Sequence, residues 1–488
     1  MPSEGRGILS PVRLPVPPLQ LAVSCCSPVS RAGRQKVNFP RLARDRLGGI
    51  VQAAELPRKL GLLDATSVVA GTMIGSAIFI VPQSVAQSLP STGMILLVWA
   101  VAGVLTFIAA LAFAELGAMM PATGGQYVFL RESYGPFWAF LLGWALFLVI
   151  RSGSTAALAA GFSIYLSYLV PLTPPLSKFA SVALIAVLTY VNYRGVRAGA
   201  IVQNLFTLLK LLGLALLIGS AFATRQPSAF EWSWIPQGFA GDQFGVALIS
   251  CLWACQGWFV VSFVAGEVKE PQRNLPLSLG WGVAAAVSIY LLANIAYLKI
   301  LSIPEIAATE RVAATVAERT IGPLGAALVS LTIVLSIIGA ANGGILAAPR
   351  VYFAQARDGL FFRRFGEIHP RFETPWFSIL GQGIWASILA LSGSYQKLFQ
   401  YVIFASWIFY GMTVVGVILL RRRRPQVSRP YRMWGYPVTP VLFAAVTLWF
   451  VTNTLITTPG PSLMGLLIIA TGVPGYFLWR RQRRQLPA

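Results

Sequence analysis

One charged side chain stands in the middle of a long apolar segment. Lys210 is the only charged residue between Leu205 and Ile218. An ammonium group at the centre of a bilayer is costly, so a lysine in this place predicts a functional contact inside a helical bundle. The alternative is that the side chain extends to the membrane surface, which suits a residue near the end of a span better than one in its middle.

Two other apolar segments are interrupted by small and polar residues. The first reads Val69-Ala-Gly-Thr-Met-Ile-Gly-Ser-Ala-Ile-Phe79, and the second reads Leu252-Trp-Ala-Cys-Gln-Gly-Trp-Phe-Val260. Interrupted helices at matching places in two halves of a chain indicate an inverted repeat with a binding site near the membrane midplane. Glycines also let helices pack closely, and Gly71 with Gly75 forms a GxxxG, so the spacing alone leaves both explanations open.

The composition places these segments in a membrane. Hydrophobic residues make up 56% and charged residues 11% of the 488 residues, and the mean hydropathy is +0.69. A soluble chain carries about twice that share of charge, and the apolar runs reach the roughly 20 residues that cross a bilayer. We predict an all-α integral membrane protein with twelve transmembrane helices near 63–88, 93–119, 137–168, 177–194, 201–223, 242–266, 276–301, 321–355, 375–392, 397–420, 435–456 and 462–480.

The net charge of +22 is unevenly distributed between the two predicted sides. Lys and Arg gather in alternate loops and in the N-terminal tail, which is the positive-inside pattern. It predicts a multi-pass protein of the cell (plasma or inner) membrane with both termini in the cytoplasm, and it argues against nucleic-acid binding. Residues 1–57 lack a helical period and are expected to form a disordered cytoplasmic tail.

The residues for enzyme chemistry are missing. The single histidine, His369, lies in a predicted cytoplasmic loop without further metal ligands, which excludes a zinc site and a Ser/His/Asp arrangement. The chain has no GxxxxGK[ST] motif for ATP. Cys251 and Cys255 lie inside a span, where they are expected to be small apolar residues. The sequence therefore predicts no enzyme, no metal and no cofactor.

Several motifs resemble the L-type amino acid transporters of the amino acid–polyamine–organocation superfamily. Gly71-Thr-Met-Ile-Gly-Ser-Ala-Ile-Phe79 and Gly266-Glu-Val-Lys-Glu-Pro-Gln-Arg-Asn-Leu-Pro276 are similar to that family's first- and sixth-helix signatures. The resemblance runs from about Leu60 to Arg484. It implies a LeuT-type 5+5 inverted repeat, with repeats at 58–223 and 224–420 and two further helices at 421–488. It also implies sodium-independent exchange or facilitated transport of L-amino acids by alternating access.

A transporter of this kind would bind its amino acid between the unwound first and sixth helices. Backbone amides at the start of a half-helix suit a carboxylate, because the dipole is positive there. The expected carboxylate site is Gly75, Ser76, Ala77 and Ile78. The carbonyls that the resemblance assigns to the substrate ammonium lie near Trp253, Ala254 and Cys255. The Ser76 hydroxyl could instead bond back to its own helix.

Departures from the family pattern concern the size of the substrate. Ala77 stands where the family usually has glycine, and its methyl group restricts the turn. Gln256 replaces a small residue and adds a polar group facing the site, which argues against a large apolar amino acid. Trp253 would cover the substrate from outside, unless it only packs. Ser154 and Ser406 match positions near the substrate side chain, where core packing is the alternative.

The charged residues also receive roles from the resemblance. Lys210 would bridge the first and eighth helices where ion-coupled relatives bind sodium, with Ser336 as its eighth-helix partner. Arg151 is interpreted as a structural cation facing the bundle interior. Glu267 and Arg273, at the cytoplasmic end of the sixth helix, form either an inner gate or a solvated charged loop.

The expected partners are a small-molecule amino acid and the lipid bilayer. Light chains of the animal family link to a glycoprotein through a cysteine after the third helix, whereas the loop from Tyr168 to Lys178 has none. A disulfide-linked heavy chain is therefore not predicted. The alternatives are an amine or polyamine permease, which would need acidic residues facing the site, a proton-coupled permease, or an amino acid sensor without transport.

Overall fold

The described part of the chain is helical. A computed structural model describes residues 55–225, 228–234, 241–392 and 395–485, so the predicted tail at 1–57 lies outside it except for its last three residues. Within these ranges ten helical segments are long and apolar enough to cross a membrane, or eleven when one bent pair counts as a span. The prediction of an all-α membrane protein is confirmed.

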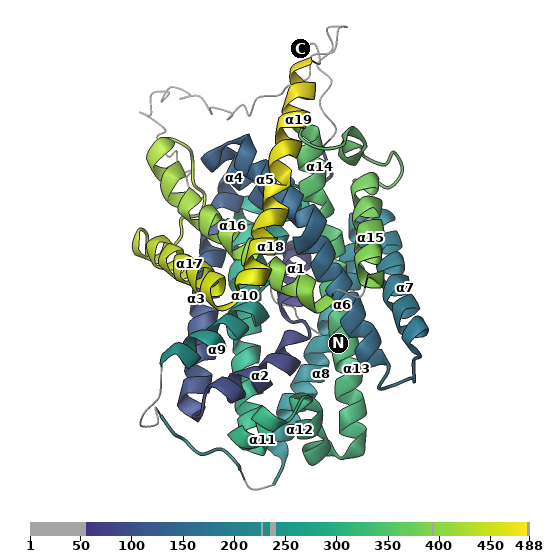
Figure 1. Ribbon diagram of the computed structural model, residues 1–488, viewed down its shortest axis with the longest axis vertical. Coiled ribbons are helices and arrows are strands. Elements are labelled where there is room, and N and C mark those ends of the chain that lie inside the picture. Colours follow the sequence, from purple (N-terminus) through teal and green to yellow (C-terminus); the bar gives the residue numbers. More distant parts are fainter. Residues whose placement is uncertain (1–54, 226–227, 235–240, 393–394, 486–488) are drawn as a thin grey trace, which may run out of the picture. The chain divides into compact units, whose positions relative to one another are not determined.

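Two spans are broken where the sequence predicted interruptions (Figure 1). Helix α1 (Leu62–Met73) and helix α2 (Ala77–Ser88) meet at an angle of 40°. Helix α9 (Gly241–Ala254) is followed by η2 (Trp258–Glu267), a 3₁₀-helix, with Gly257 at φ +108° between them. A long 3₁₀ segment inside a span is uncommon and often marks a functional hinge. Both breaks therefore interrupt the regular backbone bonding inside the bundle.

The remaining long segments follow the predicted spans closely. They are α3 (Thr92–Met119), α5–η1–α6 (Pro136–Ala145, Leu146–Ile150, Arg151–Leu166), α7 (Pro174–Tyr193), α8 (Val196–Ala223), α10 (Pro271–Ile300), α13–α14 (Pro323–Ala347, Pro349–Arg357), α16 (Tyr395–Arg423), α17 (Val438–Thr457) and α18–α19 (Pro459–Ala470, Gly472–Gln485). Helix α15 (Trp376–Leu391) is apolar but has 16 residues, fewer than the length expected of a full span. The count of twelve spans therefore stays a prediction.

Short helices fill two of the connections. Helix α4 (Gln126–Tyr134) lies between α3 and α5, and it packs against η2, α14 and α16. A Cβ at Gly125, the residue before it, would lie 2.1 Å from the Ser262 carbonyl oxygen, so the approach to η2 requires glycine. Helices α11 (Ile303–Ala308) and α12 (Val312–Ile321) form the connection between α10 and α13.

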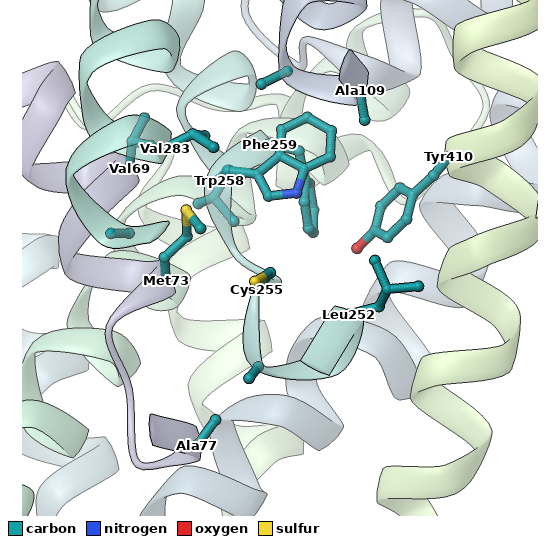
Figure 2. Packing of buried hydrophobic residues seen from close by; sticks show 14 of the residues in the cluster. Val69, Met73, Ala77, Ala109, Leu252, Cys255, Trp258, Phe259, Val283 and Tyr410 are labelled. Atoms are coloured by element: carbon teal, nitrogen blue, oxygen red, sulfur yellow. The ribbon is translucent and has the colours of Figure 1, made fainter. Parts of the chain in front are cut away.

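Helix α1 lies at the centre of the packing. It contacts α8, α10, α13 and η2, which surround the first break. Buried apolar side chains from these helices and from α3 and α16 form one continuous core around both breaks. Figure 2 shows Met73 and Ala77 on either side of the first break, with Cys255 at the second. The two interruptions are thus held together by apolar packing.

Candidate functional site

A cavity of about 250 Å³ lies between the two broken helices. Its wall includes seven of the ten residues that the sequence placed around a substrate: Gly75, Ser76, Ala77, Ser154, Trp253, Ala254 and Gln256. Ile78 and Cys255 are buried behind the wall, and Ser406 packs beside Phe259 and Tyr410 instead. A cavity of this size and lining suits a small molecule.

The first break presents the beginning of α2 to this cavity. The amides of Ser76, Ala77 and Ile78 lie at the start of a helix, where backbone donors have no acceptor within the helix. The Gly75 backbone amide was also expected to bind the carboxylate, but it donates to the Met73 carbonyl at 2.8 Å. In this conformation the backbone amides of Ser76 and Ala77 are therefore available at the cavity wall for an anionic group, whereas Ile78 lies behind the wall.

The second break is held by a residue that the sequence did not single out. The Tyr290 hydroxyl of α10 lies 3.1 Å from the Ala254 carbonyl and 2.7 Å from the Met73 carbonyl, so it can donate to either break. The Trp253 carbonyl accepts a hydrogen bond from the backbone amide of Gln256 at 3.0 Å. A carbonyl has two lone pairs, so these bonds leave acceptor capacity at the cavity wall. A tyrosine in an apolar helix carries no sequence signal for such a contact.

The two breaks touch each other directly. The Thr72 hydroxyl of α1 lies 2.9 Å from the Gly257 carbonyl, to which it can donate as an alternative to the Val68 and Val69 carbonyls of its own helix. A Cβ at Gly257 would lie 2.7 Å from the Thr72 carbonyl oxygen, which is closer than Cβ atoms approach in proteins. Glycine is therefore needed here both for its positive φ and for this close approach.

Lys210 of α8 joins two backbone segments, the end of α1 and the middle of α13. Its Nζ donates to the carbonyls of Gly71 at 2.8 Å, Ile74 at 2.7 Å and Ser336 at 3.1 Å. The Ser336 hydroxyl also donates to the Ile74 carbonyl, at 2.8 Å. The ammonium is fully buried and has no acidic partner in the described residues. A fixed cation thus links the end of α1 to α13.

Arg151 lies on the cavity wall rather than only in the bundle interior. It begins α6 directly after η1, a π-helical stretch of a kind found often at functional sites. Its guanidinium lies 5.1 Å from the centre of the Phe259 ring, and its buried Nε has no hydrogen-bond acceptor within the described structure. The cavity wall therefore carries a cation, and none of its lining residues is acidic.

Aromatic rings close one side of the second break. Figure 2 shows Trp258, Phe259 and Tyr410 converging there. The Phe259 and Tyr410 ring centres are 4.8 Å apart, as are those of Phe113 and Trp258. These contacts fill the space between η2, α3 and α16 with apolar side chains, so the cavity does not continue along η2.

A buried ion pair lies at the far end of η2. Glu267 and Arg350 of α14 are both fully buried, and Nε donates to the carboxylate at 2.6 Å. Arg273 is not part of this contact, because it is exposed and lies 3.6 Å from Glu270. The structure therefore separates the two residues that the sequence grouped as a gate. The Arg350 partner was missed because the two residues are 83 positions apart.

Fold and site together define a multi-pass membrane protein with a small-molecule cavity between two broken helices, an arrangement typical of secondary transporters. The profile of the amino acid permease family matches residues 60–477. The chain therefore belongs to the amino acid permease family, whose members are transporters and not enzymes, and it is an amino acid transporter. The resemblance to L-type transporters is confirmed.

Individual relatives agree with the family. The chain is 35% identical to the human b(0,+)-type amino acid transporter 1, over 88% of this chain and 89% of that protein. It is 34% identical to the serine/threonine exchanger SteT of Bacillus subtilis (strain 168), over 88% and 98%. It is 31% identical to the human cystine/glutamate transporter, over 88% and 86%. The similarity covers most of each protein.

Proposed function

We propose that the chain is a sodium-independent transporter of L-amino acids that works by alternating access. The observation that carries the proposal is the cavity, because both broken helices contribute to its wall. The substrate carboxylate would bind the amides of Ser76 and Ala77, and its ammonium the carbonyls at the end of α9. In this proposal, the first break belongs to a repeat at 58–223 and the second to an inverted repeat at 224–420.

The contacts of Lys210 support sodium independence. Three converging carbonyls are the kind of ligand set that binds a cation, and here the lysine ammonium occupies it. A covalently attached cation satisfies the carbonyls in every conformation that keeps α1 and α13 together. A dissolved cation is then not needed to hold the end of α1.

The position of the cavity supports alternating access. It extends along α2, α6 and α9, toward residues such as Ile80, Tyr165 and Trp253. By the predicted topology these segments face the outside. The rings of Trp258, Phe259 and Tyr410, here called the aromatic layer, and the Glu267–Arg350 pair lie on the cytoplasmic side. This arrangement corresponds to an outward-facing state, in which Trp253 would close over the bound amino acid.

The charge of the cavity argues against an amine or polyamine as substrate. Arg151 would repel a ligand with a net positive charge, and no lining carboxylate would balance it. A zwitterion avoids this repulsion, since its carboxylate compensates for its ammonium. The relatives named above are consistent with amino acids as the substrate class.

The test is uptake of radiolabelled L-amino acids into proteoliposomes that contain the purified chain. We expect uptake that is unchanged when choline replaces sodium. Dependence on internal amino acid would identify exchange, and uptake into empty vesicles would identify facilitated transport. Uptake driven by an imposed proton gradient would favour the proton-coupled alternative, and binding without uptake would favour the sensor.

A further inference from the structure

A second cavity lies at the cytoplasmic end predicted for α7, α14 and α15. It has a volume of about 670 Å³, and its wall includes Tyr193, Arg357, Glu367, His369 and Trp376. It is separate from the amino acid cavity, with which it shares no lining residue. None of these five residues has a part in the proposed transport of amino acids.

His369 supplies a hydrogen-bond donor at this cavity, and two cations lie near the ring that stacks on it. His369 accepts bonds at Nδ1 from the amides of Arg371 and Phe372, both at 3.1 Å, so the neutral ring carries its proton on Nε2 and presents a donor. The Phe372 ring stacks on His369 with centres 4.6 Å apart. The guanidinium groups of Arg194 and Arg371 lie 5.3 Å and 5.5 Å from that same Phe372 ring.

The local charge is positive. Arg357 is part of the wall, and Arg194 and Arg371 lie over the Phe372 ring, which stacks on the lining residue His369. Glu367 is the acidic residue among the described lining residues. Glu373 is neutralised by Lys59, with Nζ 2.5 Å from its carboxylate. The cavity therefore favours an anionic ligand that also accepts several hydrogen bonds, and a phosphate group has both properties.

The helices next to the cavity expose apolar side chains that suit the acyl chains of a lipid. Helices α7 and α15 pack side by side (Figure 1), and both begin or end at this cavity. Their outer faces expose Val187 by 59%, Ile384 by 63% and Ile388 by 50%. In a membrane protein these side chains contact acyl chains. Trp376 at the start of α15 occupies the position in which tryptophan marks the membrane surface.

We propose that this cavity binds the headgroup of an anionic phospholipid, whose acyl chains lie along α7 and α15. Arg357, Arg371 and Arg194 surround the phosphate, and the His369 Nε2–H donates to one of its oxygens. Basic pockets between spans on the cytoplasmic side bind anionic headgroups by the same chemistry. The ligand class is a phosphodiester with net negative charge, such as phosphatidylglycerol.

The test uses the full chain, purified in detergent and titrated with phosphatidylglycerol while bound lipid is counted by native mass spectrometry. We expect the double variant Arg357→Gln/Arg371→Gln to bind phosphatidylglycerol about fivefold more weakly for each arginine removed. The matched control is Arg480→Gln/Arg481→Gln on α19, which removes the same charge from residues that do not line the cavity and should bind like the unchanged chain. Phosphatidylcholine, which has no net charge, should bind weakly to all three.

Equal phosphatidylglycerol binding by both double variants would overturn the proposal, as would equally tight binding of phosphatidylcholine. A third arm adds sodium phosphate or glycerol 1-phosphate at the lipid concentration. Displacement of the lipid by these would assign the cavity to a soluble phosphate compound instead. Thermal unfolding without lipid checks that each variant is folded, and the single variants Arg357→Gln and Arg371→Gln replace the double variant if it does not fold.

Discussion

At the scale of single residues, Lys210 is the side chain on which the site depends most. Three buried carbonyls share its ammonium, and two of them belong to the last turn of α1. A buried carbonyl left without a donor costs about 1–3 kcal/mol, and of the three only Ile74 has a second side-chain donor in the described residues, the Ser336 hydroxyl. The end of α1, and with it the geometry of the first break, is therefore set by one amine from α8.

We expect Lys210→Ala to lower the initial rate of amino acid uptake by about tenfold or more, since the loss of one such contact already equals a factor of about ten. Uptake is measured in proteoliposomes at equal protein content. The control is Lys299→Ala, because Lys299 donates to the Phe222 carbonyl at the exposed end of α10, at 3.0 Å. Uptake by Lys210→Ala at the unchanged rate would contradict the bridging role.

The sequence identified functional residues where their type differs from that of the residues around them. Lys210 was conspicuous in an apolar run, and the small residues around Gly75 and Gly257 were conspicuous in spans. Tyr290 and Arg350 could not be identified in this way, because a tyrosine within a span and an arginine near the end of a span are both common. Their roles depend on contacts with segments far away in the chain, which no local pattern encodes.

At the scale of elements, the two breaks behave as one unit because they are bonded to each other. We expect Gly257→Ala to destabilise the protein by about 1–3 kcal/mol and to reduce uptake, since φ of +108° is strained for alanine. The new methyl group would also meet the Thr72 carbonyl. Thermal unfolding and uptake are measured together.

Gly280→Ala is the matched control for that prediction. Gly280 lies within α10, and a Cβ there would meet no heavy atom within 4 Å. Alanine favours the helix over glycine by up to about 1 kcal/mol, so stability should stay equal or rise. If both variants unfolded at the same temperature and transported equally, the close contact between the breaks would have no energetic importance.

Helix α11 offers a prediction about pH. The Arg319 side chain, hydrogen-bonded to Glu305, and the Ser302 cap lower the pKa of Glu305 from 4.5 to about 2. Because the folded pKa lies below the ordinary value, ionised Glu305 stabilises α11 above pH 4.5, and this contribution is lost as the pH falls toward 2. Amide hydrogen exchange in 303–308, corrected for intrinsic rates, should accelerate over this range. In Glu305→Gln the same amides should exchange faster at pH 6 and change little on acidification.

The elements themselves were largely predictable, because long apolar runs with short connections specify spans and their order. The ends of the helices were less predictable from the sequence. Helix α7 begins at Pro174 and α8 at Val196, some residues before the predicted spans, because helices extend beyond the apolar run into the membrane surface. The separation of α13 from α14 and the 3₁₀ form of η2 depend on tertiary contacts rather than on composition.

At the scale of the whole molecule, access to the cavity from one side requires closure on the other. The cytoplasmic side predicted from charge is closed by the aromatic layer and the buried Glu267–Arg350 pair. Removing one partner of a buried ion pair typically costs about 3–5 kcal/mol, because the remaining charge stays without compensation. An exposed pair such as Arg273–Glu270 contributes about 0–1 kcal/mol. The two residues grouped by the sequence should therefore differ sharply in their effect on opening.

We expect Glu267→Gln to shift the population toward states that open at the end of η2, whereas Arg273→Gln should leave it nearly unchanged. The probe is Ser262→Cys, a buried position under Gly125 that a membrane-impermeant thiol reagent reaches only after α4 and η2 separate. Labelling should accelerate at least about tenfold in the Glu267→Gln background, since 1.4 kcal/mol corresponds to a factor of ten. Thermal unfolding of both backgrounds separates local opening from loss of the fold. Equal labelling rates in the two backgrounds would mean that the Glu267–Arg350 pair does not hold this side closed.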